Sequence, residues 1–179
     1  MNKRSGSKKK LKAVLGLTVI VIVIVTILAF LLRDQLAAFG VESTDLSSLT
    51  INGIAVNENI ADVQWDVYKK NPSFVDKSTE AAEYRYYEDF LVVYESDGAI
   101  IKLKTLSEHG IMSQAGDELT ELNEVESKLG DQYTVRSYDS AQGLKARVYY
   151  DKENRIKASF VYPKNAPDDK IVWSIVERY

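Results

Sequence analysis

The side chains that most often carry catalysis are scarce in this chain of 179 residues. It has no cysteine, and its single histidine, His109, stands between Glu108 and Gly110 with no nucleophile close by in the sequence. The serine-hydrolase motif G-x-S-x-G, the zinc motif H-E-x-x-H and a phosphate-binding glycine loop do not occur. We therefore expect no enzyme, no cofactor and no metal site, and we place His109 in a solvated loop.

Acidic residues are the most abundant group that could do chemistry. One cluster could suggest a Ca²⁺ site: Asp117, Glu118, Glu121, Glu124 and Glu126. Its spacing does not fit an EF-hand loop, and acids near a helix N-terminus stabilise the helix dipole, so we interpret the cluster as a solvated helix face. A hydrolase acting through paired carboxylates stays open as an alternative, and it requires two acids in one cleft, one of them with a raised pKa.

Aromatic side chains offer a second kind of surface. Eleven tyrosines and two tryptophans could suggest carbohydrate binding, but aromatic residues also favour strands and fill the cores of sheets. We expect core positions for Tyr94, Tyr150, Phe160 and Trp173.

Two predicted β-hairpins carry the basic residues that form our candidate binding surface. In the first, residues 90–94 and 100–103 flank Asp97-Gly98, a strong hairpin signal. In the second, residues 144–150 and 156–162 flank a polar turn. Apolar alternation then selects a register in which Val92 faces Leu103, Tyr94 faces Ile101, Val148 faces Ala158, and Ala146 faces Phe160.

This register leaves the opposite side of the sheet open, and we predict that this side binds a partner. Its candidate binding residues are Lys102, Lys104, Lys145, Arg147, Tyr149, Arg155 and Lys157, with Arg147 and Tyr149 central. An ordinary solvated sheet face is the alternative, because Lys and Arg stems readily cover strands.

The element that positions this surface in the cell is an uncharged stretch, residues 13–32, bounded by Lys12 and Arg33. As a helix it would be roughly 30 Å long, which matches the hydrocarbon core of a bilayer. Residues 1–12 contain six basic residues and no acid, which predicts a cytoplasmic N-terminus and an extracytoplasmic remainder. A cleaved signal peptide is the alternative, although its apolar region is usually shorter.

Charge divides the chain at the same place. Residues 34–179 hold 16 basic and all 26 acidic residues, a net charge of −10. Nucleic-acid binding requires a basic footprint, so we exclude it. An extracytoplasmic domain without disulfides is more typical of a bacterial surface protein, and we predict a Gram-positive-like cell membrane.

The outer part is predicted to be α+β. After a flexible stalk, residues 33–48, two repeats follow, residues 49–107 and 108–179. Each has a turn, a helix and an antiparallel meander, with helices at residues 59–70 and from Asp117 to Leu129. The hairpins align at an offset of 56 and the Gly-Ile pairs, Gly53-Ile54 and Gly110-Ile111, at 57, which indicates a duplication.

The second repeat resembles a known family. Its pattern Gly110-Ile111, Gly116-Asp117, Val125 and Leu129-Gly130 is similar to the opening of the helix-plus-sheet repeats in β-lactamase-inhibitor-protein-like proteins and small outer-membrane assembly lipoproteins. The resemblance implies tandem helix-plus-sheet repeats and binding to proteins or peptidoglycan-related targets rather than catalysis. It implies no particular binding residue.

These features predict a membrane-anchored extracytoplasmic module that binds a protein or an anionic envelope polymer. The bilayer itself is a partner through residues 13–32. A structural or accessory subunit of a membrane complex is the alternative, and the carboxylate hydrolase is a further one.

Overall fold

The computed structural model describes residues 18–28, 32–107, 110–165 and 170–179. The chain divides into two compact units, residues 1–39 and 40–179. In the first, residues 18–28 are helical and α2 (Arg33–Phe39) is a short helix. Among the described residues no helix is both long and apolar enough to cross a membrane. Parts of the predicted span, residues 13–17 and 29–31, lie outside the described residues, as does His109.

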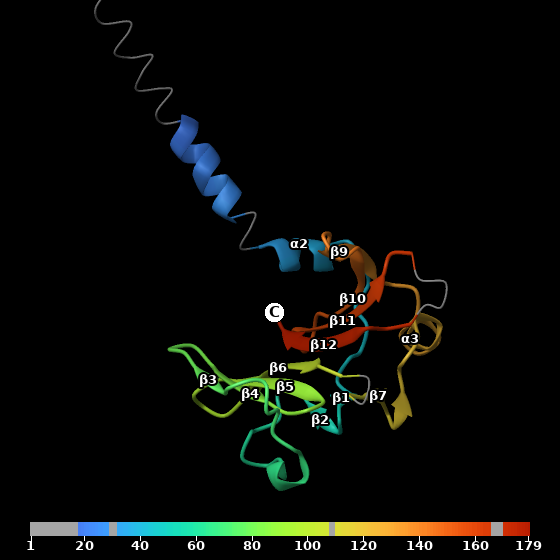
Figure 1. The fold of residues 1–179 in the computed structure, drawn as a ribbon. Helices are drawn as coiled ribbons and strands as arrows, with labels where there is room; N and C mark the ends of the chain where they lie inside the picture. Colours follow the sequence, from blue (N-terminus) through green and yellow to red (C-terminus); the bar gives the residue numbers. More distant parts are fainter. Residues whose placement is uncertain (1–17, 29–31, 108–109, 166–169) are drawn as a thin grey trace, which may run out of the picture. The chain divides into compact units, whose positions relative to one another are not determined.

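The described residues of the second unit form an α+β fold, with one α-helix and two antiparallel sheets (Figure 1). The smaller sheet has the order β2-β1-β7-β8, with β1 (Leu49–Ile51), β2 (Ile54–Ala55), β7 (Met112–Gln114) and β8 (Asp117–Glu118). The larger has the order β3-β4-β5-β6-β12-β11-β10-β9. Its strands are β3 (Lys77–Ser78), β4 (Glu83–Tyr86), β5 (Phe90–Tyr94), β6 (Ile100–Thr105), β9 (Thr134–Asp139), β10 (Leu144–Asp151), β11 (Ile156–Pro163) and β12 (Trp173–Arg178).

The smaller sheet joins the two predicted repeats. Asn52 and Gly53 have φ angles of 51° and 80°, as a type I′ turn requires, and they link β1 to β2. β1 also pairs with β7, and the Asn52 Oδ1 accepts a hydrogen bond of 2.9 Å from the backbone N–H of Ile111. The two Gly-Ile segments therefore lie side by side.

The predicted second helix is present but begins later than expected. α3 (Leu122–Leu129) starts after a capping box made by Glu121 and Glu124, and it ends at Gly130, whose φ is 82°. Asp117 cannot cap it, because Asp117 and Glu118 pair with β7 as β8. The helix buries one stripe, formed by Leu122, Val125 and Leu129.

The predicted first helix, residues 59–70, is wrong. The segment contains only the 3-10 turn η1 (Trp65–Val67). Tertiary hydrogen bonds hold the chain in other conformations: the N–H of Ile60 donates to Gly98 O at 2.8 Å, and the Tyr68 hydroxyl donates to Asn52 O at 2.7 Å. These bonds, with the stacking of Trp65 on Tyr87, override a modest helical pattern.

The first hairpin keeps most of its predicted register. Val92 pairs with Leu103 as expected, but a bulge after Val93 makes Tyr94 pair with Ile100 instead of Ile101. The cause is a three-residue turn, in which Glu95 N donates to Ala99 O and the last turn residue, Gly98, has a φ of 88°.

The second hairpin is shifted by one residue from its predicted register. Tyr149, not Val148, pairs with Ala158, because four residues separate Asp151 from its partner Ile156. The Asp151 carboxylate fixes this longer turn by accepting hydrogen bonds from Asn154 N at 2.9 Å and from Leu46 N at 3.0 Å. The shift exchanges the two faces of β10.

The hydrophobic core lies between one face of the larger sheet, the smaller sheet and α3. It includes Leu49, Ile51, Tyr87, Phe90, Val92, Leu103, Val125, Tyr149, Phe160 and Val176. Leu46 belongs to this core and is 1 % exposed, so the end of the predicted stalk is part of the folded domain.

Candidate functional site

The face of the larger sheet that points away from this core carries basic side chains from several strands. Directly paired residues share a face, and alternate residues of a strand point to opposite faces. Leu103, Val176 and Ala158 point into the core. The residues next to them along β6, β12 and β11 therefore point to the other face. We call it the basic face and define it by Lys102, Lys104, Arg136, Tyr138, Lys157, Trp173 and Glu177. The same pairing also places buried side chains on this face, namely Val148, Tyr150, Val161 and Ile175.

One row of this face crosses three strands and holds a carboxylate between two ammonium groups. Glu177 on β12 lies opposite Lys102 on β6 and Lys157 on β11. Its oxygens are 2.6 Å from Lys102 Nζ and 3.1 Å from Lys157 Nζ. Burial would raise the pKa of Glu177, but the two lysines outweigh it and hold the pKa below its ordinary value. The row is therefore charged and fixed at neutral pH, with one excess positive charge.

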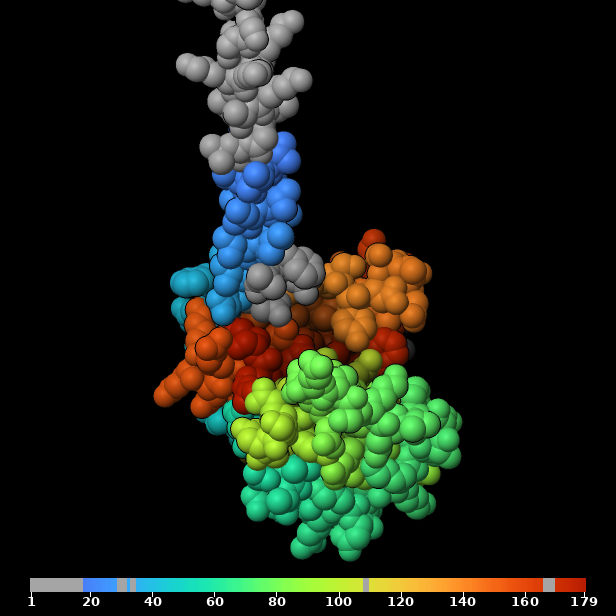
Figure 2. Space-filling view, turned by 90° about the vertical axis from the view of Figure 1, so that its left-hand side faces the viewer, coloured from blue at the N-terminus to red at the C-terminus, as the bar shows by residue number. Residues whose placement is uncertain are grey.

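A second group combines a cation with aromatic rings. Lys104 Nζ lies 4.5 Å from the ring centroid of Trp173 and 5.9 Å from that of Tyr138. The Trp173 and Tyr138 rings are 5.8 Å apart, although β11 and β10 separate their strands in the sheet. The sheet must therefore curl so that the basic face is concave. Figure 2 shows β12, in red, recessed between the green strands below and the orange segment above.

Arg136 completes the basic face on the edge strand β9. It pairs with Ala146 of β10, and its guanidinium lies 5.8 Å from the Tyr150 ring. Among the residues that define the basic face, four are basic and one, Glu177, is acidic, while residues 34–179 carry a net charge of −10. A basic concave surface with aromatic rings can attract and hold an anionic chain.

Only part of the predicted binding surface lies on this face. Lys102, Lys104 and Lys157 are placed as predicted. Lys145, Arg147 and Tyr149 are not, because the register shift turns them toward the face that holds α3 and the core. The prediction that Arg147 and Tyr149 are central to an open face is therefore wrong.

Arg147 and Tyr149, which were predicted to be central to the open face, instead bind α3 to the sheet. Arg147 donates hydrogen bonds to Leu122 O at 3.2 Å and to the Glu126 carboxylate at 2.7 Å. The Tyr149 hydroxyl donates to Gly130 O at 2.9 Å, and burial raises the pKa of Tyr149. The last candidate, Arg155, is in the hairpin turn and donates from Nε to Tyr179 O at 3.2 Å.

The sequence pattern did not place four residues on this face: Arg136, Tyr138, Trp173 and Glu177. Alternation within β12 places Trp173 and Glu177 on one face, but it does not say which face is the core. The core position expected for Trp173 is wrong, and Tyr150, although buried, also lies on the side opposite the core cluster. Strand order, which brings β12 between β6 and β11, would have been needed to find them.

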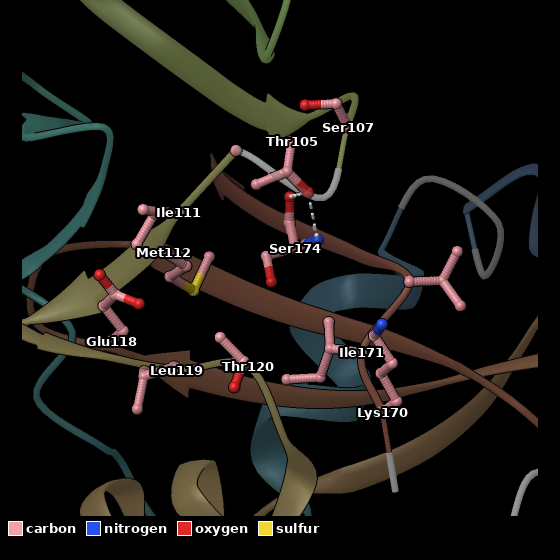
Figure 3. Close-up of a pocket in the computed structure, with 12 residues that line it drawn as sticks. Thr105, Ser107, Ile111, Met112, Glu118, Leu119, Thr120, Lys170, Ile171 and Ser174 are labelled. Carbon is pink, nitrogen blue, oxygen red and sulfur yellow. Dashed lines mark hydrogen bonds between the residues drawn. The ribbon is translucent and has the colours of Figure 1, made fainter. Parts of the chain in front are cut away.

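A separate pocket of about 510 Å³ lies between the two sheets (Figure 3). Met112, Leu119 and Ile171 form apolar walls, and Glu118 and Lys170 are its charged lining residues. The Thr105 hydroxyl is engaged, because it accepts a hydrogen bond of 2.9 Å from the Ser174 N–H. The hydroxyl of Ser107, another lining residue, donates a hydrogen bond of 2.7 Å to the Asp89 carboxylate.

Residues of the predicted acidic cluster form ion pairs and a helix cap. Asp117 pairs with Lys128 at 2.5 Å, Glu126 pairs with Arg147, and Glu124 caps α3. Within the described ranges, no three His, Cys, Asp or Glu side chains form a group that could hold a metal ion. The described carboxyls whose pKa is shifted all have it lowered, whereas a general acid needs a raised pKa.

Comparison with known proteins identifies no relative: no family model, curated protein or solved structure matches this chain. The resemblance to β-lactamase-inhibitor-protein-like repeats therefore rests on the sequence motif alone.

Proposed function

We propose that this chain is a membrane-anchored binding module whose basic face captures an anionic partner outside the cell. The observation that carries the proposal is the concentration of Lys102, Lys104, Arg136 and Lys157 on one concave face of a strongly acidic domain. These cations surround aromatic rings, which add contact area at a small entropic cost. An anionic protein segment or envelope polymer has the matching chemistry.

The anchor in this proposal is residues 13–32, with residues 1–12 in the cytoplasm and the folded domain outside a Gram-positive-like cell membrane. The uncharged stretch and the basic excess before it support this orientation. Protease added to intact cells should then remove the domain, whereas a domain that resists protease until lysis would contradict it.

We also infer that the domain arose by duplication. The hairpins β5–β6 and β10–β11 keep the offset of 56 residues, and β1 and β7, which pair with each other, begin the two halves. The missing first helix limits the likeness to the helix-plus-sheet family to the second half.

The test is a binding measurement on the full chain in detergent or nanodiscs. Fluorescently labelled poly-L-glutamate and poly(glycerol phosphate) are the two probes, which separate a peptide-like partner from a wall polymer. Lys104→Glu combined with Arg136→Glu should weaken binding of the preferred probe about tenfold or more. These two residues are chosen because Lys102 and Lys157 also neutralise Glu177.

The matched control reverses two exposed lysines away from this face, Lys152→Glu with Lys164→Glu. It changes the net charge by the same amount and should leave binding within about twofold. Equal loss in both double variants at low salt would refute the basic face as the site. If pull-down of a partner requires residues 1–33 but not the basic face, the chain is instead an accessory subunit of a membrane complex.

A further inference from the structure

The two edges of the larger sheet differ sharply. β3, at one edge, has two residues, and the edge strands of the smaller sheet, β2 and β8, also have two each. β9, at the other edge, has six. Within the described part of the chain, β9 pairs only with β10. Its outer side therefore offers a row of backbone N–H and C=O groups to another strand.

β9 has some of the devices that block such pairing, since its pairing with β10 is irregular between Leu144 and Lys145 and it carries one basic side chain, Arg136. Natural edge strands are commonly very short, lysine-rich or interrupted by proline. The β9 sequence, Thr-Val-Arg-Ser-Tyr-Asp, has neither lysine nor proline, and its Val135 side chain is 51 % exposed. An edge of this length and composition is suited to accept an added strand.

The two sides of β9 present different chemistry to such a strand. Arg136 and Tyr138 lie on the basic face, and the Tyr138 ring is close to Lys104 and Trp173. Val135 lies on the opposite face, since it pairs with Arg147. Successive side chains of an added strand alternate between these faces, and side chains on one face are about 7 Å apart.

We propose that the partner is an extended peptide segment that pairs with the free edge of β9 as a ninth strand. Its alternate side chains are acidic, to meet Arg136 and Lys104, and those between them are small and apolar, to pack beside Val135. This inference rests on the proposed function and names its partner class. Charge complementarity selects such a peptide over a second copy of this chain, whose own β9 would bring another Arg136 to the same place.

The first experiment uses the full chain and a short, acetylated and amidated peptide of alternating glutamate and valine. Backbone N-methylation removes hydrogen-bond donors without changing charge. Methylating the residues whose N–H groups face β9 should weaken binding about tenfold or more, whereas methylating the alternate residues should leave it nearly unchanged. If the peptide does not bind, or if both methylated peptides bind as well as the parent, strand addition is refuted.

The second experiment exploits the absence of cysteine from the chain. Val135→Cys introduces a single thiol at an exposed position, and a cysteine is moved along the peptide. Disulfide formation should follow a period of two, strong at valine positions and weak at glutamate positions. Uniform crosslinking would contradict a paired strand, and a disulfide-linked homodimer formed in the presence of excess peptide would show that a second copy takes the edge.

Different results would refute the proposed strand addition and the proposed binding function. If anionic polymers still bind in a manner that depends on Lys104 and Arg136 but the peptide shows no N-methylation pattern, the basic face stands and strand addition falls. If neither probe depends on those residues, the proposed function itself falls.

Discussion

Replacing Glu177 by glutamine tests whether the central row of the basic face is organised by charge. The change keeps the side-chain shape and removes the negative charge between Lys102 and Lys157. Both lysines would then face each other across β12, with only one oxygen left to accept from either. The row should lose its fixed geometry and some of the domain's stability.

The structure sets the size of this loss. Two charge-assisted contacts, at 2.6 and 3.1 Å, are weakened together, while the Glu177 side chain is only 22 % exposed. Such contacts contribute about 1.5–3 kcal/mol each, and the exposure of Lys102 reduces the sum, so we expect a loss of about 2 kcal/mol. For a domain of this length that corresponds to a fall in Tm of about 6–10 °C.

The loss should depend on pH with a defined sign. Because the pKa of Glu177 is lowered in the folded state, the unfolded chain takes up the proton first as the pH falls. The stabilisation is therefore complete above the ordinary glutamate pKa and is lost as the pH falls through the lowered folded value. The wild type and Glu177→Gln should converge in stability across that acidic window.

Urea denaturation followed by circular dichroism, at neutral pH and in steps down to pH 3.5, measures both effects. Glu153→Gln, in the exposed turn after β10, is the control and should change stability by less than about 0.5 kcal/mol. If Glu177→Gln is no less stable than this control at neutral pH, or if its deficit persists undiminished at acid pH, the charge argument is wrong.

Three further substitutions probe how α3 is fastened to the sheet, each by urea denaturation. Val125→Asp buries an unpaired charge and should cost about 3–5 kcal/mol, whereas Val135→Asp, on an exposed position, should cost less than about 0.5; similar costs would contradict the buried stripe. Tyr149→Phe leaves Gly130 O without its donor and should cost about 1–2 kcal/mol. Because the pKa of Tyr149 is raised by burial, wild-type stability should also fall as the pH rises above the ordinary tyrosine pKa, and a parallel fall in Tyr149→Phe would exclude Tyr149 as its source. Arg147→Met removes two hydrogen bonds to α3 and should cost about 1–2 kcal/mol, and an unchanged midpoint would mean that these bonds add nothing.

Local pattern located the four strands of the two predicted hairpins. β5 begins and ends as predicted, and β10 and β11 each extend one residue beyond the predicted end. Each has β-favouring residues bounded by turn signals, so the information is contained in a few neighbouring positions. The helix that ends at Leu129 was predicted for the same reason.

Features that depend on distant partners were not predictable in this way. The start of α3 moved because Asp117 and Glu118 pair with β7, and residues 59–70 failed to form a helix because Ile60 and Tyr68 bond to other segments. β3, β7 and β8 have too few residues to show any period. Their positions are set by tertiary contacts that no local window contains.

The position of the candidate site depends strongly on one such tertiary contact. The predicted and observed registers of the second hairpin differ by a single residue, yet the difference moves Arg147 and Tyr149 from an open face to the underside of α3. Asp151 decides between the two registers, because its carboxylate holds both the four-residue turn and the backbone of Leu46. A binding surface deduced from alternation alone is therefore only as secure as the turn that sets the register. On β6 and β11 the prediction of basic residues opposite the core held, and these two strands, with β12 between them, form the floor on which an anionic partner would lie.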